Sequence, residues 1–385
     1  MVTKNDERST EIKALSDTIN EIRCALEKDS ENDAIQLAKS GFQKALTLEV
    51  KSAAAWELSE LMIELNLESE GLTLANKQLN LSWDSTDVTR YAGLLVLAGL
   101  EDKATQLLYD EAQKDSSRID IIGNLIELVL SNSNWQIIDK LSITNSDISK
   151  LVGEVKRRAY PFIGEHLDVR RYTYSLAKII VLGGAEDEGD TVQAYWFVQL
   201  DEYEAALILR RLLAWLQNEK IELSAVYSGD KMASPFALAL AKKLGIEVCH
   251  EISSNGRTMR VFSSADTFQS VSKPINDNTL TFSLSVNELP SWQVALLQSP
   301  IDIVGIIAPT TLSWSEDSIV FPQLGAISSS YRDTQSEKSC VTLSPESIAE
   351  SILKEFKELP YDDALGSILE FYKIHKERIR LYSGE

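Results

Sequence analysis

Apolar residues recur at steps of three and four positions throughout the first third of the chain. This spacing places apolar side chains on one face of an α-helix. Between residues 11 and 28 they are Ile12, Leu15, Ile19, Ile22 and Leu26, and residues 34–46 repeat the pattern. The same pattern predicts consecutive helix pairs at residues 53–65 and 69–82, 87–99 and 101–114, and 118–131 and 134–141.

Short polar clusters separate these helices. Asn66-Leu67-Glu68 divides the members of one pair, and Asp84-Ser85-Thr86 and Asp115-Ser116-Ser117 separate successive pairs. Asp and Ser side chains accept hydrogen bonds from the first N–H groups of a helix. The polar clusters therefore predict where the helices begin.

Large residues early in successive helix pairs recur at a nearly constant interval. From Trp56 to Tyr91 is 35 positions (91 − 56), and from Tyr91 to Ile122 is 31 (122 − 91). An interval near ~34 residues is typical of stacked helical hairpins, which bury their apolar faces only against neighbouring copies. The first third of the chain is therefore expected to form a helical array.

This region resembles the tetratricopeptide repeat over roughly residues 34–142, or about three units, which is near the minimum for a stable stack. Trp56, Tyr91 and Ile122 take the place of the family's large residue early in the first helix. The small residues expected where helices cross are Ala75, Gly93 and Ala104. The proline that ends the family's repeat is absent, and its neighbourhood is occupied by Val50, Asp84 and Asp115.

The resemblance implies that the concave face of the array binds a protein or peptide partner. The alternative is that the helices only support the following domain and bind nothing. Trp83 and Trp135 lie near the ends of units, where we expect core or junction residues rather than a platform for a ligand.

Further along the chain the pattern changes to short apolar runs that alternate with helical segments. Residues 178–182 are expected to form a strand: after Lys178 comes an unbroken apolar run that glycines close, which is typical of a buried parallel strand. Further strands are expected at 223–227, 247–252, 281–286 and 302–308, and helices at 201–217, 234–244 and about 290–298, while 192–200 is either a strand or the start of a helix. This alternation predicts a mainly parallel sheet covered by helices on both faces.

The chain is therefore expected to have an α plus α/β organisation, with a Rossmann-like, three-layer α/β domain after the repeats. Ser344 and Pro345 predict the start of a C-terminal helix, because Ser favours the N-cap and Pro the first helical position. A last helix is expected at 362–382. We divide the chain into an N-terminal helix (1–30), helical repeats (31–145), a polar connector (146–176), the α/β domain (177–342) and C-terminal helices (343–385).

Ligands of such sheets bind at the carboxyl ends of the strands. Three loops follow predicted strands, at residues 183–190, 228–231 and 308–311. The candidate ligand-binding residues are Gly183, Gly184, Ser228, Gly229, Asp230, Lys231, Thr310 and Thr311.

The first of these loops is acidic. Glu186, Asp187 and Asp190 carry the oxygen donors that Mg²⁺ and Ca²⁺ prefer, although the loop lacks the spacing of an EF-hand. Clustered surface acids are common in so acidic a chain, so we expect no cofactor and keep Mg²⁺ as the alternative. The turn at 228–231 either presents backbone N–H groups to a phosphate or forms only an N-cap turn.

Residues 200–244 resemble the middle of the histidine-phosphatase fold, with a helix, a strand ending in Tyr227-Ser228-Gly229, and an alanine-rich helix. Catalysis in that family requires an Arg-His-Gly after the first strand and a second His after a late strand. Leu182-Gly183-Gly184 and Ala308-Pro309-Thr310 stand at those places. The resemblance therefore implies a domain without that family's nucleophile. A phosphoribosyltransferase-like or glycosyltransferase-like sheet would give the same pattern.

Composition narrows the classes of partner. The 385-residue chain has 58 Asp and Glu against 38 Lys and Arg, a formal charge of −20 that disfavours nucleic acid. No apolar run approaches the ~18 residues that span a bilayer, and the start has no apolar stretch of the signal-peptide type. Cys24, Cys249 and Cys340 are too scattered for a cysteine-based zinc site or a disulfide framework. We expect a cytoplasmic protein that binds neither nucleic acid nor membranes; the pattern specifies no oligomeric state.

These observations favour a scaffold or adaptor whose repeat arm holds a partner and whose α/β domain is non-catalytic. The chain contains no G-x-S-x-G, H-E-x-x-H or C-x-x-C motif. The alternative is a transferase-like or phosphatase-like enzyme that acts on a phosphorylated or nucleotide-linked small molecule through the loops at 183–190, 228–231 and 308–311.

Overall fold

The computed structural model describes residues 4–160, 168–184, 187, 198–249, 251, 256–272, 278–314 and 344–383. Contacts divide the chain into two compact units, one with most residues up to Asn145 and the other with most residues from Ser146 onward. A run of helices followed by a parallel sheet with helices confirms the predicted α plus α/β organisation. Within the described residues, no helix is both long enough and apolar enough to cross a membrane.

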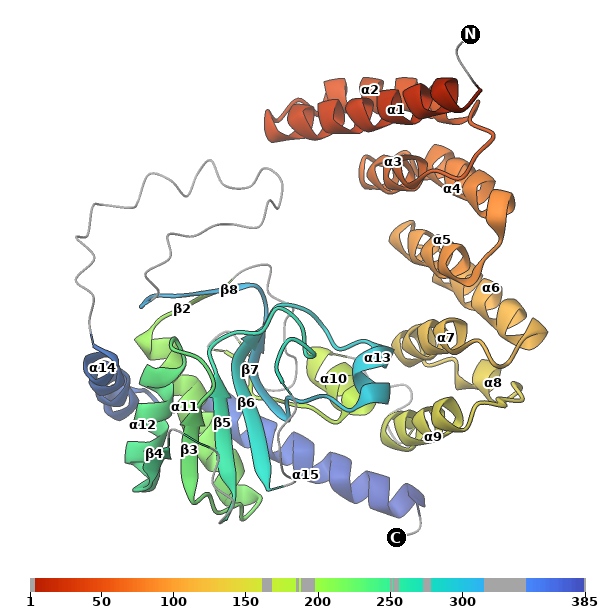
Figure 1. The fold of residues 1–385 in the computed structure, drawn as a ribbon. Coiled ribbons are helices and arrows are strands. Elements are labelled where there is room, and N and C mark those ends of the chain that lie inside the picture. Colours follow the sequence, from red (N-terminus) through yellow and green to blue (C-terminus); the bar gives the residue numbers. More distant parts are fainter. Residues whose placement is uncertain are drawn as a thin grey trace. The chain divides into compact units, whose positions relative to one another are not determined.

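The first unit is an array of α-helices that pair as hairpins (Figure 1). α1 packs against α2, α3 against α4 and α5 against α6, and each hairpin contacts the next. The helices are α1 (Lys4–Glu27), α2 (Glu31–Ala45), α3 (Ala53–Glu64), α4 (Glu68–Ser82), α5 (Ser85–Leu97), α6 (Glu101–Lys114), α7 (Ile119–Asn132) and α8 (Trp135–Ile138). The periodicity therefore predicts every helix of this series, although α8 is shorter than expected.

The helix boundaries define the repeat more sharply than the periodicity does. α3, α5 and α7 begin at residues 53, 85 and 119, so Trp56, Val88 and Ile122 each lie three positions after a helix start. All three side chains are buried. Val88 is therefore the structural counterpart of Trp56 and Ile122, because Tyr91 lies about one helical turn further along α5.

Paired helices approach each other closely at small residues in the second helix of each hairpin. Ala34 of α2, Gly71 of α4 and Ala104 of α6 each lie three positions after the start of their helix. A Cβ atom at Gly71 would lie only 2.7 Å from the Ser59 carbonyl oxygen of α3, whereas a Cβ at Gly93 would meet nothing within 4 Å. The prediction that Gly93 lies at a helix crossing is therefore wrong, and Gly71 has that role.

Residues 146–176, predicted to be a polar connector, contain helices. α9 (Ser146–Ala159) and α10 (Val169–Ala177) pack against each other. The buried Arg158 guanidinium of α9 donates hydrogen bonds of 2.7 and 2.8 Å to two carbonyl oxygens in the last turn of α10. Polar residues that suggest a linker in the sequence therefore include groups that hold a helix pair together.

The second unit is built around a fully parallel six-stranded sheet with the order β1-β7-β6-β5-β3-β4. Its strands are β1 (Ile180–Val181), β3 (Ala225–Ser228), β4 (Glu247–Cys249), β5 (Thr258–Phe262), β6 (Thr279–Val286) and β7 (Ile303–Ile307). The run β4-β3-β5-β6-β7 is one of the common doubly wound orders, and β1 extends it at one edge. Its switch point lies at β3, because the chain passes first to the neighbour β4 and then to the opposite neighbour β5.

Two strands of this unit differ from the expectation. β5 is not predicted, because Thr258 and Arg260 interrupt its apolar run. β2 (Val198–Leu200) and β8 (Thr310–Leu312) form a separate two-stranded parallel sheet. Part of the predicted loop at 308–311 is therefore strand.

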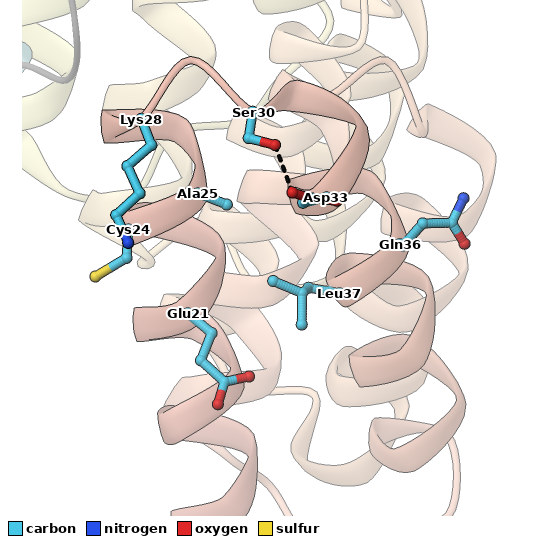
Figure 2. A pocket seen from close by; sticks show the side chains of 8 residues that line it. All are labelled: Glu21, Cys24, Ala25, Lys28, Ser30, Asp33, Gln36 and Leu37. Carbon is cyan, nitrogen blue, oxygen red and sulfur yellow. Dashed lines mark hydrogen bonds between the residues drawn. The ribbon is translucent and has the colours of Figure 1, made fainter.

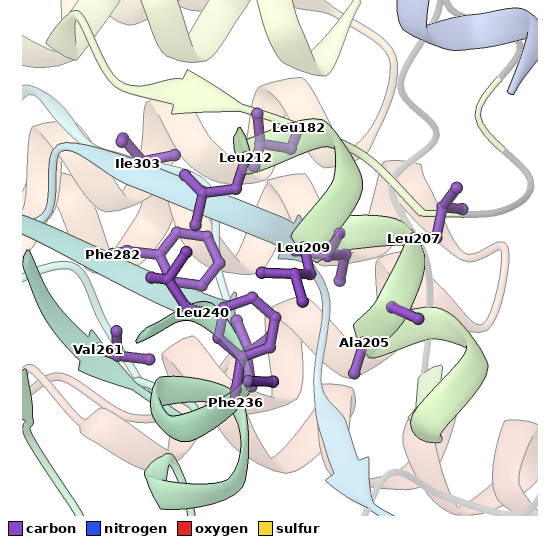
Figure 3. Packing of buried hydrophobic residues seen from close by; sticks show 14 of the residues in the cluster. Leu182, Ala205, Leu207, Leu209, Leu212, Phe236, Leu240, Val261, Phe282 and Ile303 are labelled. Carbon is purple, nitrogen blue, oxygen red and sulfur yellow. The ribbon is translucent and has the colours of Figure 1, made fainter. Parts of the chain in front are cut away.

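Helices cover both faces of the six-stranded sheet, as a three-layer domain requires. One face packs against α11 (Glu202–Asn218), α12 (Ser234–Leu244), α14 (Pro345–Glu358) and α15 (Asp363–Ser383). Figure 3 shows side chains of α11 and α12 meeting those of the strands, and the rings of Phe236 and Phe282 stack 5.2 Å apart. A smaller apolar cluster on the opposite face includes Val294 of α13 (Trp292–Leu297).

Four buried charges join elements of this unit that are distant in sequence. The Asp187 carboxylate lies 2.5 Å from Arg170 Nη2 of α10 and 3.4 Å from Arg211 Nη1 of α11. Arg211 also pairs with Asp362, which precedes α15, at 2.9 Å. Two positive and two negative groups balance, so each offsets part of the desolvation cost of its neighbours.

The hydroxyl of Tyr372 on α15 completes the hydrogen bonding of the edge strand β1. It accepts a hydrogen bond from the Val181 N–H at 2.7 Å and donates one to the Val181 carbonyl oxygen at 2.9 Å. Burial raises the pKa of Tyr372, so the hydroxyl keeps the proton that it donates. Backbone groups at a sheet edge are otherwise open to pairing with another strand, and here a side chain covers them.

Replacing Tyr372 with Phe should destabilise the protein, because it leaves the buried Val181 N–H without its acceptor and removes one of the two donors to the Val181 carbonyl oxygen, which keeps a hydrogen bond from Arg170 Nε at 3.2 Å. We expect Tyr372→Phe to lower the free energy of unfolding by roughly 1–3 kcal/mol. Tyr361→Phe is the matched control, since Tyr361 is 86% exposed. Equal midpoints for the two variants in urea unfolding would contradict this role of Tyr372.

Two helical glycines of the array, Gly71 and Gly93, should respond oppositely to the same substitution. Ala is favoured over Gly in a helix by about 1 kcal/mol, so Gly93→Ala should be neutral or stabilising. Gly71→Ala should be destabilising by roughly 1–3 kcal/mol, because its Cβ overlaps the backbone of α3. Thermal unfolding of both variants measures the difference; a Gly71→Ala protein as stable as Gly93→Ala would refute the close packing of α3 and α4.

Candidate functional site

The turn after β3 lies at the switch point of the sheet, where ligands of doubly wound domains bind. Asp230 connects this turn to the end of β5. Its Oδ1 accepts a hydrogen bond from the Ala233 N–H and its Oδ2 accepts one from the Ser263 N–H, both at 2.8 Å. The carboxylate therefore fixes the β3–α12 turn against the neighbouring strand.

Gly229 makes the closest approach in this turn. A Cβ atom at Gly229 would lie 2.5 Å from the ring of Phe262, and the Gly229 N–H donates to the Val261 carbonyl oxygen at 2.7 Å. The N–H groups of Gly229 and Ala233 thus have partners within the chain. These bonds favour the N-cap turn over a backbone cradle for phosphate.

The Ser228 hydroxyl also bonds locally. It donates to the Asp230 carbonyl oxygen at 2.7 Å and lies 3.1 Å from the Ser234 hydroxyl. Neither partner is a base that could take up its proton, so these contacts position the turn rather than activate a nucleophile. Lys231 is exposed.

Gly183 and Gly184 shape a different turn, at the end of β1. Gly183 has a φ of +80° and a Cβ there would overlap the Asp187 carboxylate, so the turn favours glycine. The Gly184 carbonyl oxygen accepts a hydrogen bond from Arg211 Nη1 at 3.0 Å. The two glycines therefore belong to the buried charge cluster.

Of the predicted metal ligands, Glu186 and Asp190 lie outside the described residues. Asp187 contacts Arg170 and Arg211, whose positive charge disfavours a cation at the same carboxylate. Over the part of the chain that the structure describes, no group of three or more His, Cys, Asp or Glu side chains is placed to hold a metal ion.

Thr310 and Thr311 belong to β8. The Thr310 hydroxyl donates to the Ala308 carbonyl oxygen at 2.8 Å. Shortly after β8, the Trp314 indole Nε1 donates to the Met232 carbonyl oxygen at 3.0 Å. This bond joins the chain just after β8 to the residue that follows the turn at 228–231.

The first predicted loop is distant from that turn. Four steps in strand order separate β1 from β3, which corresponds to about 19 Å at ~4.8 Å per strand. The glycines at 183 and 184 therefore lie at the far edge of the sheet.

Arg260, in the middle of β5, is not among the residues that the sequence predicts for a site. Its register partners are Tyr227 on β3 and Thr281 on β6. All three occupy the sheet face opposite α11 and α12, since the adjacent strand residues belong to the core beneath those helices. The alternation of polar and apolar residues over 258–261 is the signal that could have revealed this strand.

The Arg260 side chain is only 5% exposed. Its Nη1 donates to the Ser272 carbonyl oxygen at 2.8 Å and its Nη2 to the Ser272 hydroxyl at 2.9 Å. The guanidinium carbon lies 5.0 Å from the centre of the Phe262 ring. Burial lowers the pKa of Arg260.

In the helical array, the exposed side of α3 is acidic. Glu57, Glu60 and Glu64 follow one another at steps of three and four along this helix. Arg23 of α1 pairs with Glu57 at 2.5 Å, whereas no ion pair among the described residues involves Glu60 or Glu64. Partial burial and the neighbouring Glu60 raise the pKa of Glu64.

Of the two tryptophans near the unit ends, Trp135 is a core residue, whereas Trp83 is 42% exposed and lies at the junction of two hairpins. Trp83, between α4 and α5, donates from Nε1 to Glu111 of α6 at 3.2 Å, and Lys114 lies 5.6 Å from its ring centre. Trp135 is buried.

A shallow pocket of about 600 Å³ lies beside the turn between α1 and α2 (Figure 2). Gln36 points away from Glu21 and Cys24, and the Ser30 hydroxyl donates to the Asp33 carboxylate at 2.5 Å. Small-molecule sites have polar groups that converge on one ligand. The lining residues, which do not converge in this way, are Glu21, Cys24, Ala25, Lys28, Ser30, Asp33, Gln36 and Leu37.

Removing the Asp230 carboxylate should destabilise the turn at the switch point. Asp230→Ala leaves the Ala233 and Ser263 N–H groups without this acceptor, so we expect a loss of roughly 1–3 kcal/mol in the free energy of unfolding. Lys231→Ala, the neighbouring exposed position, should change it by less than about 0.5 kcal/mol. Denaturant unfolding measures both; equal stabilities would mean that Asp230 does not hold the turn.

No family model matches the chain, and no curated protein matches it at a significant level. The likeness of residues 34–142 to tetratricopeptide repeats therefore depends on the period and packing of these helices alone.

Proposed function

We propose that this protein is a scaffold or adaptor and that its helical array, of tetratricopeptide type, binds a protein or peptide partner. The observation that carries the proposal is the regular series of hairpins, with starts of first helices at residues 53, 85 and 119 and a buried residue at the same place in each. Stacks of this period present extended surfaces to other chains.

The contacts among the helices support this reading. α1 contacts α3, and α3 contacts α5, so the first helices of successive hairpins lie in one row, while α2 contacts α4 in a second row. A row of first helices offers one continuous face built from several repeats. A partner that spans it would touch residues far apart in sequence.

Charge suggests the chemistry of that partner. Glu60 and Glu64 lie in the first-helix row, are exposed, and form no ion pair among the described residues. An acidic stripe attracts Lys and Arg side chains and speeds the encounter with a basic partner. We therefore propose a basic segment of a protein as the partner of α3 and its neighbours.

The test uses the full chain as immobilised bait in native extract of its source cells, with cross-linking to map the contacted residues. The charge-reversed variant Glu60→Lys/Glu64→Lys should recover roughly threefold less of the captured partner than the wild type. The control Glu222→Lys/Glu358→Lys makes the same change in charge at exposed positions outside the array.

Cross-links to α1, α3 and α5 that are lost in the array variant and kept in the control would support the proposal. Capture that all three proteins show equally, with cross-links confined to residues after 146, would overturn it. So would capture of nothing at all by the wild type.

A further inference from the structure

Arg260 is a buried guanidinium that pairs with no carboxylate in the part of the chain that the structure describes. The buried arginines in the described part of the chain are Arg158, Arg170, Arg211 and Arg260. The first three lie 3.7 Å from Glu154, 2.5 Å from Asp187 and 2.9 Å from Asp362, respectively. Over the described residues, the hydrogen bonds of Arg260 go to Ser272.

This exception calls for a physical explanation. Charges buried in proteins are normally paired, because the desolvation of an isolated ion is costly. Among the described residues, neither an ion pair nor a hydrogen bond joins an Asp or Glu to Arg260. An anion from outside the chain would supply the missing counter-charge.

The hydrogen-bonding groups around Arg260 are suited to an anion. Ser272 accepts from Nη1 and Nη2, while Nε has no partner among the described residues, so one edge of the planar guanidinium remains for an acceptor. The hydroxyl of Thr281, its register partner, is also buried and without a partner. A guanidinium edge with a nearby hydroxyl matches the oxygens of a carboxylate or a phosphate.

The position in the sheet supports the same inference. Arg260 and its neighbour Tyr227 lie on β5 and β3, the two strands that meet at the switch point. Phe262, two positions further along β5, places an aromatic ring beside the guanidinium. The described part of the connection after β5 packs on the same face, where Phe268 and Val271 belong to the smaller apolar cluster.

We propose that Arg260, together with the Thr281 hydroxyl, binds the oxyanion group of a small molecule on the sheet face opposite α11 and α12. The group is a carboxylate or a phosphate, bonded to the Nε edge of the guanidinium. This site is independent of partner binding by the helical array, so the two proposals stand or fall separately.

Thermal unfolding of the full chain tests the site with defined probes. We expect inorganic phosphate, succinate or both to raise the unfolding midpoint saturably by roughly 3–6 °C, because a ligand that binds the folded state stabilises it. Sodium chloride at the same ionic strength should have no such effect. The oxyanion that raises the midpoint identifies the ligand group as phosphate or carboxylate; failure of both probes would overturn the proposal.

Substitutions locate the effect. Arg260→Gln should abolish the rise in midpoint. Arg210→Gln should retain it, because Arg210 of α11 donates only to carbonyl oxygens at and after the end of α14, on the opposite face. An equal rise in Arg260→Gln and the wild type would show that the oxyanion binds elsewhere.

If Arg260→Gln does not fold, Thr281→Val still tests the site. Valine has nearly the shape of threonine and removes a hydroxyl without a partner, so the variant should be at least as stable as the wild type without ligand. Its affinity for the effective oxyanion, from isothermal titration, should fall about tenfold with the loss of one hydrogen bond to a charged group. Unchanged affinity in Thr281→Val would contradict the assigned site.

Discussion

The sheet of the α/β unit depends on a balance of charge around Asp187. This carboxylate lies between the guanidinium groups of Arg170 and Arg211, and Asp362 completes the set. Burying any one of these charges alone would cost more than a single hydrogen bond returns. The four side chains therefore become buried and paired in the same folding step. They connect α10, α11 and the start of α15 to the turn after β1.

The helical array is stabilised in another way. Its hairpins repeat a few contacts, with Trp56, Val88 and Ile122 buried at one place and Ala34, Gly71 and Ala104 at another. Each contact is local in sequence, so the array is assembled from neighbour to neighbour. Such an arrangement allows the exposed side chains of the first helices to vary without loss of the stack, which suits a surface that recognises a partner.

The elements of both units follow largely from the sequence, because they depend on local periodicity and on caps. Ser344 and Pro345 predict the start of α14, and Gly245 ends α12 in the left-handed conformation that glycine favours. The connector at 146–176 and strand β5 escape prediction for one physical reason: arginines that are buried in the fold look like surface residues in the sequence. Hydrophobic pattern cannot distinguish a solvated guanidinium from one such as Arg158 or Arg260.

The candidate site was predictable only in part for a related reason. Loops after strands are visible in the sequence, and the turn at 228–231 does lie at the switch point. Which loops share a site depends on strand order, which pairs β1 with β7 and places it far from β3. The roles of Asp187 and Asp230 likewise depend on partners remote in the chain, Arg170 and Ser263 among them.

The bond between Tyr372 and β1 joins residues 191 positions apart. During synthesis, β1 therefore leaves the ribosome long before α15, whose Tyr372 hydrogen-bonds to this strand. At a synthesis rate of about 5–20 residues per second, roughly 10–40 s pass before Tyr372 is made, and during this time the Val181 backbone groups lack its hydroxyl as a partner. Over that interval the growing chain offers a binding edge to chaperones, or to a neighbouring nascent chain on the same messenger.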